Sequence, residues 1–184
     1  MEINASDVKK LRDATAAGMM EAKTALVEAN GDYDKAIEVL KSRGAAIAAK
    51  KSDRVAAEGT ISSYIHSGSK IGVLVEVMAE TDFVARDERF VAFARDIAIH
   101  IAGMKPLYLS EDQVPAEELA AQENPKAYLQ EVVLLNQSYV KDPTMTISEF
   151  LTSQIAVFKE NIKIGKFCRL ELGVTKATVS NLEG

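Results

Sequence analysis

The chain has 184 residues, of which 47% are hydrophobic and 27% are charged, and its formal net charge at pH 7 is −5. This composition is typical of a globular protein with one or two domains. No apolar run approaches the ~20 residues that a membrane-spanning helix needs. The negative charge disfavours the usual basic type of nucleic-acid binder, so we expect no direct contact with nucleic acid and none with a membrane.

The N-terminus and the cysteine content indicate the compartment. Residues Met1–Asp7 lack the basic and then apolar layout of a secretion signal, and they are too acidic for a transit peptide. Cys168 is the sole cysteine, so no internal disulfide can form. Both observations predict a cytoplasmic protein.

Residues 1–43 are predicted to form a bundle of three short helices, followed by an Ala- and Lys-rich helical connector over 44–58. We expect Ser6 to cap the first helix and Asp32 to cap the third. Asn30-Gly31 should end the second helix, because both residues tolerate a left-handed backbone. The expected inward positions are Val8, Leu11, Ala14, Leu26, Tyr33, Ala36, Ile37 and Leu40.

From Gly59 the apolar pattern takes the period of strands, and residues 59–174 are predicted to form an α+β core, with 175–184 as a tail. Thr60–His66 and Lys70–Ala79 read as a hairpin joined by a short turn. The next helix begins at Asp87 and should end at Gly103 and Pro106. Its inner face is Phe90, Phe93, Ala94, Ile97 and Ile101.

The remainder of the core is less regular. Ser110–Gln113 resembles a capping box, although Pro115 favours a later helix start, and Ala127–Leu135 fits either a helix or a strand. Thr146–Glu149 is a clearer capping box, and Ile162–Leu172 alternates as a strand. We therefore expect a small antiparallel sheet of about three strands with helices on one face.

No catalytic, cofactor-binding or metal-binding constellation is evident. The sequence has no Gly-rich phosphate loop, and its two histidines, His66 and His100, with one cysteine suggest no metal spacing. Cys168 in mid-strand is typical of a small packed side chain, with a nucleophile as the alternative. His100 is expected at a helix end or core edge, whereas His66 at a turn should be exposed and could contact a partner.

Two other features favour contact with a partner protein. Met19-Met20 follows Gly18 between two predicted helices, where flexible methionines suit a protein-contact surface, although we expect one of the two to fill the small core. Thr81–Val84 lies at a strand-to-helix corner and contains one large aromatic residue. Phe83 could be an exposed wedge or a core residue, and Asp82 beside it could be a contact group or a cap.

Three stretches of the chain resemble the elongation factor Ts family. They are Val8–Arg12 through Asp32, which includes Gly18-Met-Met20; Ile71–Val77 with Thr81-Asp-Phe-Val84; and Asn161–Ile164 through Arg169–Leu172. The resemblance spans most of the chain, and the ordered set is far more specific than any one stretch. It implies an N-terminal ubiquitin-associated-like helical domain and a non-catalytic exchange factor for the GTPase elongation factor Tu.

The resemblance also implies site residues. Asp82 and Phe83 match the family's tip that inserts near the magnesium and phosphate region of the GTPase, with Thr81 and Val84 framing it. Arg12, Met19 and Met20 match the helical domain's contact with the partner. His66 matches a second contact more weakly.

One departure from long members of the family bears on assembly. This chain has a single core copy, and its 115–135 segment is shortened, so two chains are expected to pair as a homodimer that rebuilds the missing half. Two alternatives to exchange stay open: an adaptor that binds through the helical bundle without affecting nucleotide turnover, and a small enzyme that uses His66 or Cys168.

Overall fold

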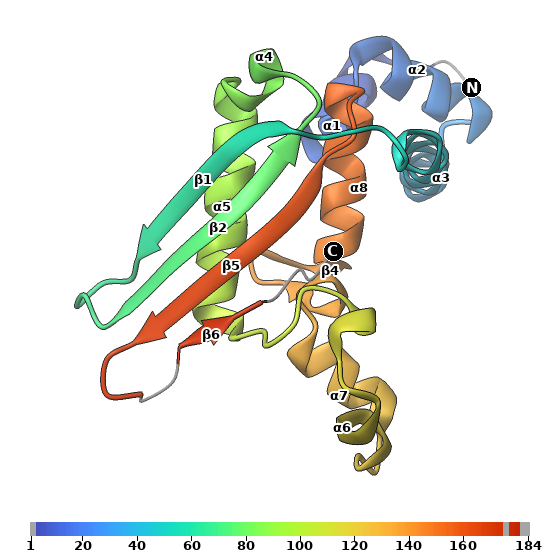
Figure 1. The fold of residues 1–184 in the computed structure, drawn as a ribbon. Coiled ribbons are helices and arrows are strands. Elements are labelled where there is room, and N and C mark those ends of the chain that lie inside the picture. The colour runs from blue at the N-terminus through green and yellow to red at the C-terminus, as the bar shows by residue number, and fades with distance from the viewer. Residues whose placement is uncertain (1–2, 175–176, 181–184) are drawn as a thin grey trace. The chain divides into compact units, whose positions relative to one another are not determined.

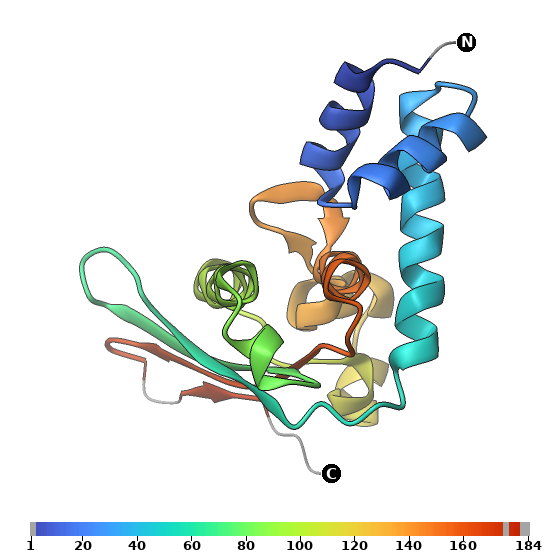
Figure 2. The same cartoon turned by 90° about the horizontal axis from the view of Figure 1, so that it is seen from above.

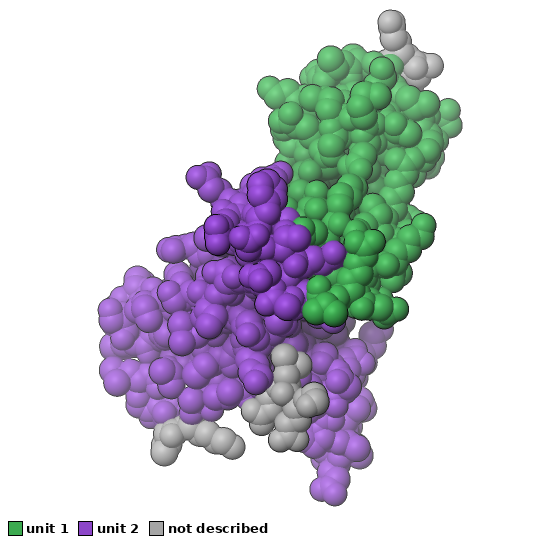
Figure 3. All heavy atoms as spheres, turned by 45° about the horizontal axis from the view of Figure 1, so that its top comes forward, with its two compact units in different colours: residues 1–55, 151–161 green, residues 56–150, 162–184 purple. Residues whose placement is uncertain are grey.

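The structure is a computed structural model that describes residues 3–174 and 177–180 (Figure 1). The chain divides into two compact units (Figure 3). Unit 1 comprises residues 1–55 with 151–161, and unit 2 comprises residues 56–150 with 162–184. The finer boundaries at 43 and 58 stay a prediction, and the predicted tail 175–184 falls mostly outside the described residues.

Unit 1 begins with three helices, α1 (Ala5–Thr15), α2 (Met19–Glu28) and α3 (Tyr33–Lys51). Asn4, not Ser6, caps α1, because its side-chain oxygen accepts a hydrogen bond from the Asp7 N–H at 2.8 Å. Asp32 caps α3 as predicted. The link between α2 and α3 has positive φ at Asn30 and Gly31, which confirms the expected left-handed helix end.

The core of this helical unit is small. Its buried members are Val8, Leu11, Ala22, Ala25, Leu26, Ala29 and Ala36. The expectation that Ala14 points inward is wrong, because this residue near the end of α1 is exposed. α3 continues without a break to Lys51, so the predicted connector is largely the second half of one helix.

Residues 151–161 complete unit 1 although they are far away in the sequence. Gly44 is buried in α3, and a β-carbon there would lie 3.5 Å from the Ala156 β-carbon, so α3 packs closely against the helix that carries Ala156. The Asn161 side-chain amide donates to the backbone oxygens of Ser52 at 3.2 Å and Arg54 at 2.7 Å. These contacts attach the segment to the C-terminal half of α3.

Unit 2 is built on an antiparallel sheet of four strands in the order β1-β2-β5-β6 (Figure 1). The strands are β1 (Glu58–Ile65), β2 (Ile71–Ala79), β5 (Lys163–Glu171) and β6 (Thr178–Val179). The first three match the predicted strands. β6 was not predicted, because two residues are too short to show an alternating pattern.

Helix α5 (Glu88–Met104) covers one face of this sheet, as Figure 2 shows from above. All five residues predicted for its inner stripe are buried. They face the sheet's inward residues Val73, Val75, Val77, Ala79, Ile164 and Phe167. The helix runs past Gly103 and ends where Lys105 takes a left-handed conformation, because glycine inside an amphipathic helix is tolerated when its stripe is well packed.

His100 lies wholly inside this core, not at its edge as expected. Its Nε2 is 3.0 Å from the Gln137 side-chain oxygen, and its Nδ1 accepts from the Val140 N–H at 3.2 Å. The Nδ1 bond requires an unprotonated nitrogen, and burial lowers the pKa of the imidazole against a weaker opposing effect of Gln137.

The segment after α5 consists of short elements followed by the last helix. They are a 3-10 turn (Glu111–Gln113), α6 (Ala116–Ala120), α7 (Pro125–Val132), a second 3-10 turn (Leu134–Asn136), β3 (Ser138–Tyr139), β4 (Asp142–Thr146) and α8 (Ile147–Phe158). Ser110 provides no side-chain cap, and the helix starts after Pro115. The Thr146–Glu149 capping box is confirmed by reciprocal bonds of 2.8 and 3.2 Å. The β3–β4 hairpin was not predicted.

The sheet face opposite α5 is apolar and exposed. Its large hydrophobic residues are Ile61, Ile65, Leu74, Leu170, Leu172 and Val179. Glu76 lies on the same face, where the register between β2 and β5 shifts. Gly165 fits there because a β-carbon would come within 2.3 Å of the Glu76 carboxylate.

Candidate partner-binding site

The Thr81–Val84 segment forms a single helical turn, α4 (Asp82–Ala85), directly beyond β2. Thr81 keeps an extended backbone, and its hydroxyl accepts a hydrogen bond from the Val84 N–H at 3.3 Å. This N-cap satisfies an amide that the first helical turn leaves unpaired. Thr81, rather than Asp82, therefore caps the turn, and the Asp82 carboxylate takes no part in the cap.

The Phe83 side chain is 80% exposed, more than any other large hydrophobic side chain in the described part of the chain. Its neighbours Val84 and Ala85 are buried. The turn is therefore anchored on one side and presents an aromatic ring on the other. The alternative that Phe83 is a core residue is wrong.

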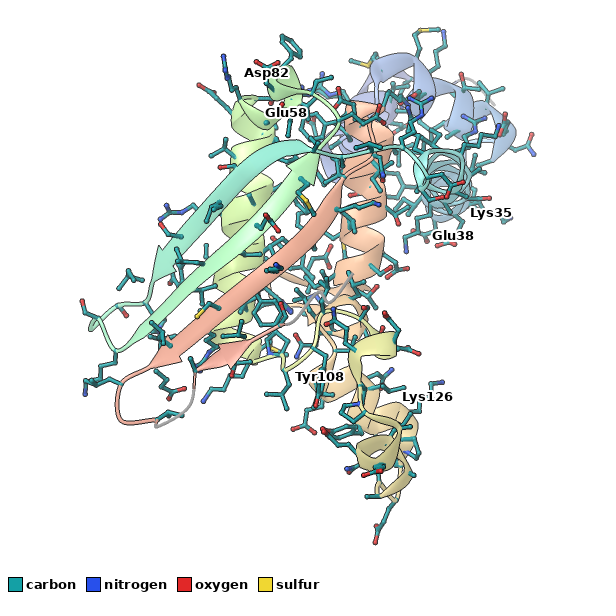
Figure 4. All side chains as sticks on the ribbon, in the orientation of Figure 1. Lys35, Glu38, Glu58, Asp82, Tyr108 and Lys126 are labelled. Atoms are coloured by element: carbon teal, nitrogen blue, oxygen red, sulfur yellow. The ribbon has the colours of Figure 1, made fainter. Side chains whose placement is uncertain are left out.

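Charged groups lie near the exposed ring. Asp82, which Figure 4 labels on α4, has one carboxylate oxygen 3.3 Å from the Arg86 guanidinium, and both side chains are exposed. Asp82, Phe83, Arg86 and Asp87 line an open hollow of about 290 Å³. An apolar ring and a carboxylate are thus presented side by side, in a form suited to insertion into another molecule.

Asp87 fixes the other end of this corner as the N-cap of α5. Its Oδ1 accepts from the Arg89 N–H at 2.8 Å, and its two oxygens bind the Arg89 guanidinium at 3.0 and 2.7 Å. These bonds with Arg89 lower the pKa of Asp87 to about 2. The sequence analysis did not identify this clamp, although an acid two positions before an arginine at a helix start was the available signal.

In unit 1, Met19 and Met20 are the first two residues of α2, and their side chains are 47% and 70% exposed. The expectation that one of them fills the core is therefore wrong, because alanines and leucines already occupy it. Arg12 is exposed in the last turn of α1, where its guanidinium binds Asp13 at 2.8 Å. The partner roles of Arg12 and the methionine pair stay predictions.

His66 is exposed as expected, at the turn between β1 and β2, and its Nδ1 lies 3.1 Å from the Tyr64 hydroxyl. β2 runs from this turn to the α4 corner. At ~3.3 Å per residue, the length of β2 separates His66 from Phe83 by roughly 25 Å or more. The structure therefore does not bring these two predicted contacts together.

The residues that the structure describes contain neither a metal-binding cluster nor a membrane-spanning helix. In residues 3–174 and 177–180, no three His, Cys, Asp or Glu side chains gather as a possible metal site. Over the same described ranges, every helix is too short or too polar to cross a membrane.

Comparison with known proteins identifies the class to which this fold and corner belong. The family model described as "Elongation factor TS" matches residues 3–127. An elongation factor Ts from Acetivibrio thermocellus is 45% identical over 93% of this chain and 90% of the relative. Those from Citrifermentans bemidjiense (44%, covering 94% and 91%) and Anaeromyxobacter sp. (46%, covering 94% and 89%) are similarly close.

The matched regions include both the helical start of the chain and the Thr81–Val84 corner. Identity above 40% over nearly the whole length of both chains leaves no large segment outside the comparison. The chain belongs to the elongation factor Ts family, whose members are translation factors in protein biosynthesis.

Proposed function

We propose that this protein is a guanine-nucleotide exchange factor that binds elongation factor Tu with GDP bound and promotes GDP release by disturbing the magnesium and phosphate site. It acts in the cytoplasm, makes and breaks no covalent bond, and touches neither nucleic acid nor membrane. The observation that carries the proposal is the exposed Phe83 ring on a capped, anchored turn, beside the Asp82 carboxylate.

Exchange is a matter of linked binding equilibria. A factor that lowers the affinity of the GTPase for nucleotide must itself bind more weakly, by the same ratio, when that nucleotide is bound. GDP is held mainly by backbone amides around its phosphates and by magnesium contacts. Insertion of Phe83 with Asp82 near these groups would displace them, and the complex would then release GDP.

The size of the effect follows from apolar burial. Burying one exposed Phe stabilises a complex by about 1.5–3 kcal/mol, or one to two decades at 1.4 kcal/mol per decade. Phe83 alone is therefore insufficient for very strong coupling between binding of the factor and loss of GDP. Contacts from Arg12, Met19 and Met20, with a second contact at His66, supply additional binding free energy in this proposal.

The direct test is release of fluorescent GDP from elongation factor Tu. Phe83→Ala should reduce the maximal stimulated rate by about 10- to 100-fold, because the lost burial is worth one to two decades. Val91→Ala removes another exposed apolar side chain from unit 2 and should leave the rate unchanged. A folded Phe83→Ala variant with the wild-type rate would remove Phe83 from the mechanism.

The adaptor alternative rests on the exposed methionine pair in the helical unit. An adaptor would bind the GTPase and leave the rate of GDP release unaltered. The release assay with the wild-type chain separates the two functions, because saturable binding without acceleration fits only the adaptor.

We further propose that two chains pair through the exposed sheet face opposite α5. Exposed apolar patches of this kind mark interfaces, and this face also carries charges of both signs, Glu76 with Lys163 and Lys166. In a two-fold arrangement each patch meets its own copy, so the carboxylate of one chain can face the ammonium groups of the other.

Sedimentation of the free chain tests this pairing. The wild type should sediment as a dimer, and Leu74→Asp should sediment as a monomer, because a charge would enter the apolar interface. Leu107→Asp also places a carboxylate at an exposed leucine of unit 2, but off the sheet face, and should remain dimeric. A monomeric wild type at all concentrations would contradict the proposal.

A further inference from the structure

Lys159 has an unusual backbone conformation for its residue type. It follows α8 directly with φ at 58°, in the left-handed region, and its N–H donates to the Ile155 oxygen at 2.9 Å. Helices commonly end in this way, but with glycine or asparagine, because a β-carbon makes the conformation costly. A lysine in such a costly conformation suggests a role for its side chain.

The Lys159 ammonium binds Glu21, which is 138 positions away in the sequence, at 2.7 Å. The other Glu21 oxygen accepts from the Gly18 N–H at 3.0 Å. These two bonds, with Lys159 contributing most, lower the pKa of the Glu21 carboxyl. The carboxylate is therefore held at both oxygens, by the start of α2 on one side and by the end of α8 on the other.

Glu21 immediately follows the exposed methionine pair in the first turn of α2. A constraint on Glu21 is therefore a constraint on the backbone that carries Met19 and Met20. Residues 151–161 are fixed within the same unit by the Asn161 bonds to Ser52 and Arg54 and by the packing at Gly44. Lys159 thus ties the turn to an already anchored segment.

We propose that Lys159 is a positioning residue for the Met19–Met20 surface. It acts through Glu21 to hold the first turn of α2 in the orientation in which the methionines meet the partner. This inference rests on the proposed function, in which that surface docks on the GTPase. Methionine side chains are flexible, so fixing their backbone in advance reduces the ordering cost of association.

Lys159→Gly is the most informative variant, because it removes the ammonium group and relieves the backbone strain together. Its melting temperature should equal or exceed that of the wild type. The concentration that gives half-maximal stimulation of GDP release should rise about 2- to 5-fold, the range expected for an exposed ion pair. The maximal rate should not change, because the Phe83 turn is untouched.

Two further variants make the comparison specific. Lys159→Arg retains a cation and should keep the wild-type half-maximal concentration. Lys105→Gly is a matched control, because Lys105 is also a left-handed lysine after a helix, with an ion pair to Glu171 at 3.4 Å. It lies in unit 2 and should leave the half-maximal concentration unchanged.

The outcomes separate the possible failures. A wild-type chain that does not accelerate GDP release would overturn the proposed function itself. If the wild type accelerates release and Lys159→Gly has the same half-maximal concentration, the positioning role is refuted. The same conclusion follows if the melting temperature and the maximal rate of Lys159→Gly fall together, because that result describes a purely structural residue.

Discussion

The two exposed apolar contacts, Phe83 in unit 2 and Met19–Met20 in unit 1, both lie in the first turn of a helix but are held differently. The Phe83 turn is fixed by neighbours within a few residues: the Thr81 cap and the buried Val84 and Ala85. The methionine turn depends on Lys159, far away in the sequence. A rigid ring held locally suits insertion, whereas flexible side chains on a remotely held turn suit a broad docking surface.

This difference predicts that the two contacts control different kinetic quantities. The double variant Met19→Ala/Met20→Ala should raise the half-maximal concentration about tenfold or more, because it removes two side chains that become partly buried when the surface docks on the partner. Its maximal release rate should be near that of the wild type. Titration of fluorescent-GDP release measures both values. A lowered maximal rate with an unchanged half-maximal concentration would show that the methionines act in release, as Phe83 does, and not in docking.

A smaller effect is expected at the cap of the Phe83 turn. Thr81→Ala removes an N-cap worth about 1 kcal/mol, so the maximal release rate should fall about fivefold. Thr81→Ser retains the hydroxyl and should behave as the wild type. If the alanine variant stimulates GDP release at the full rate, the turn does not need its cap to present the ring.

The smallest effect concerns the Asp87–Arg89 clamp and appears only in acid. The pKa of Asp87 is about 2 in the folded chain, against an ordinary value of 3.8. Because the folded value is the lower one, its stabilisation is complete above pH ~4 and is lost as the pH falls through about 2.

Asp87→Asn keeps an oxygen for the cap but cannot titrate. The difference in melting temperature between the wild type and Asp87→Asn should therefore be constant from pH 5 to 8 and shrink between pH 4 and 2. Thermal unfolding monitored by circular dichroism over this range measures it. A difference that is independent of pH down to 2 would show that the clamp contributes no charge-dependent stability.

Much of the fold could be predicted because its signals are local. The Thr146–Glu149 box, the Asp32 cap, the α5 stripe and the β1–β2 hairpin each depend on residues within one continuous stretch of the sequence. The same reasoning placed Ser6 as a cap in error, because Asn4 offers an equivalent oxygen two positions earlier.

What could not be predicted depends on distant partners. The burial of His100 depends on Gln137, and the exposure of both methionines depends on the other side chains that fill the small core of the helical unit. Phe83 could not be assigned from the pattern alone, since an aromatic residue next to buried positions fits a core and a surface equally well. Its exposure follows from the turn that Thr81 starts.

The close approach of Gly165 to Glu76 fixes where a negative charge lies on the exposed sheet face. A β-carbon at 165 would collide with the glutamate carboxylate at 2.3 Å. Because the carboxylate is the end of a flexible side chain, Gly165→Ala should be accommodated by a movement of Glu76, and the negative charge would then change its position on the exposed sheet face.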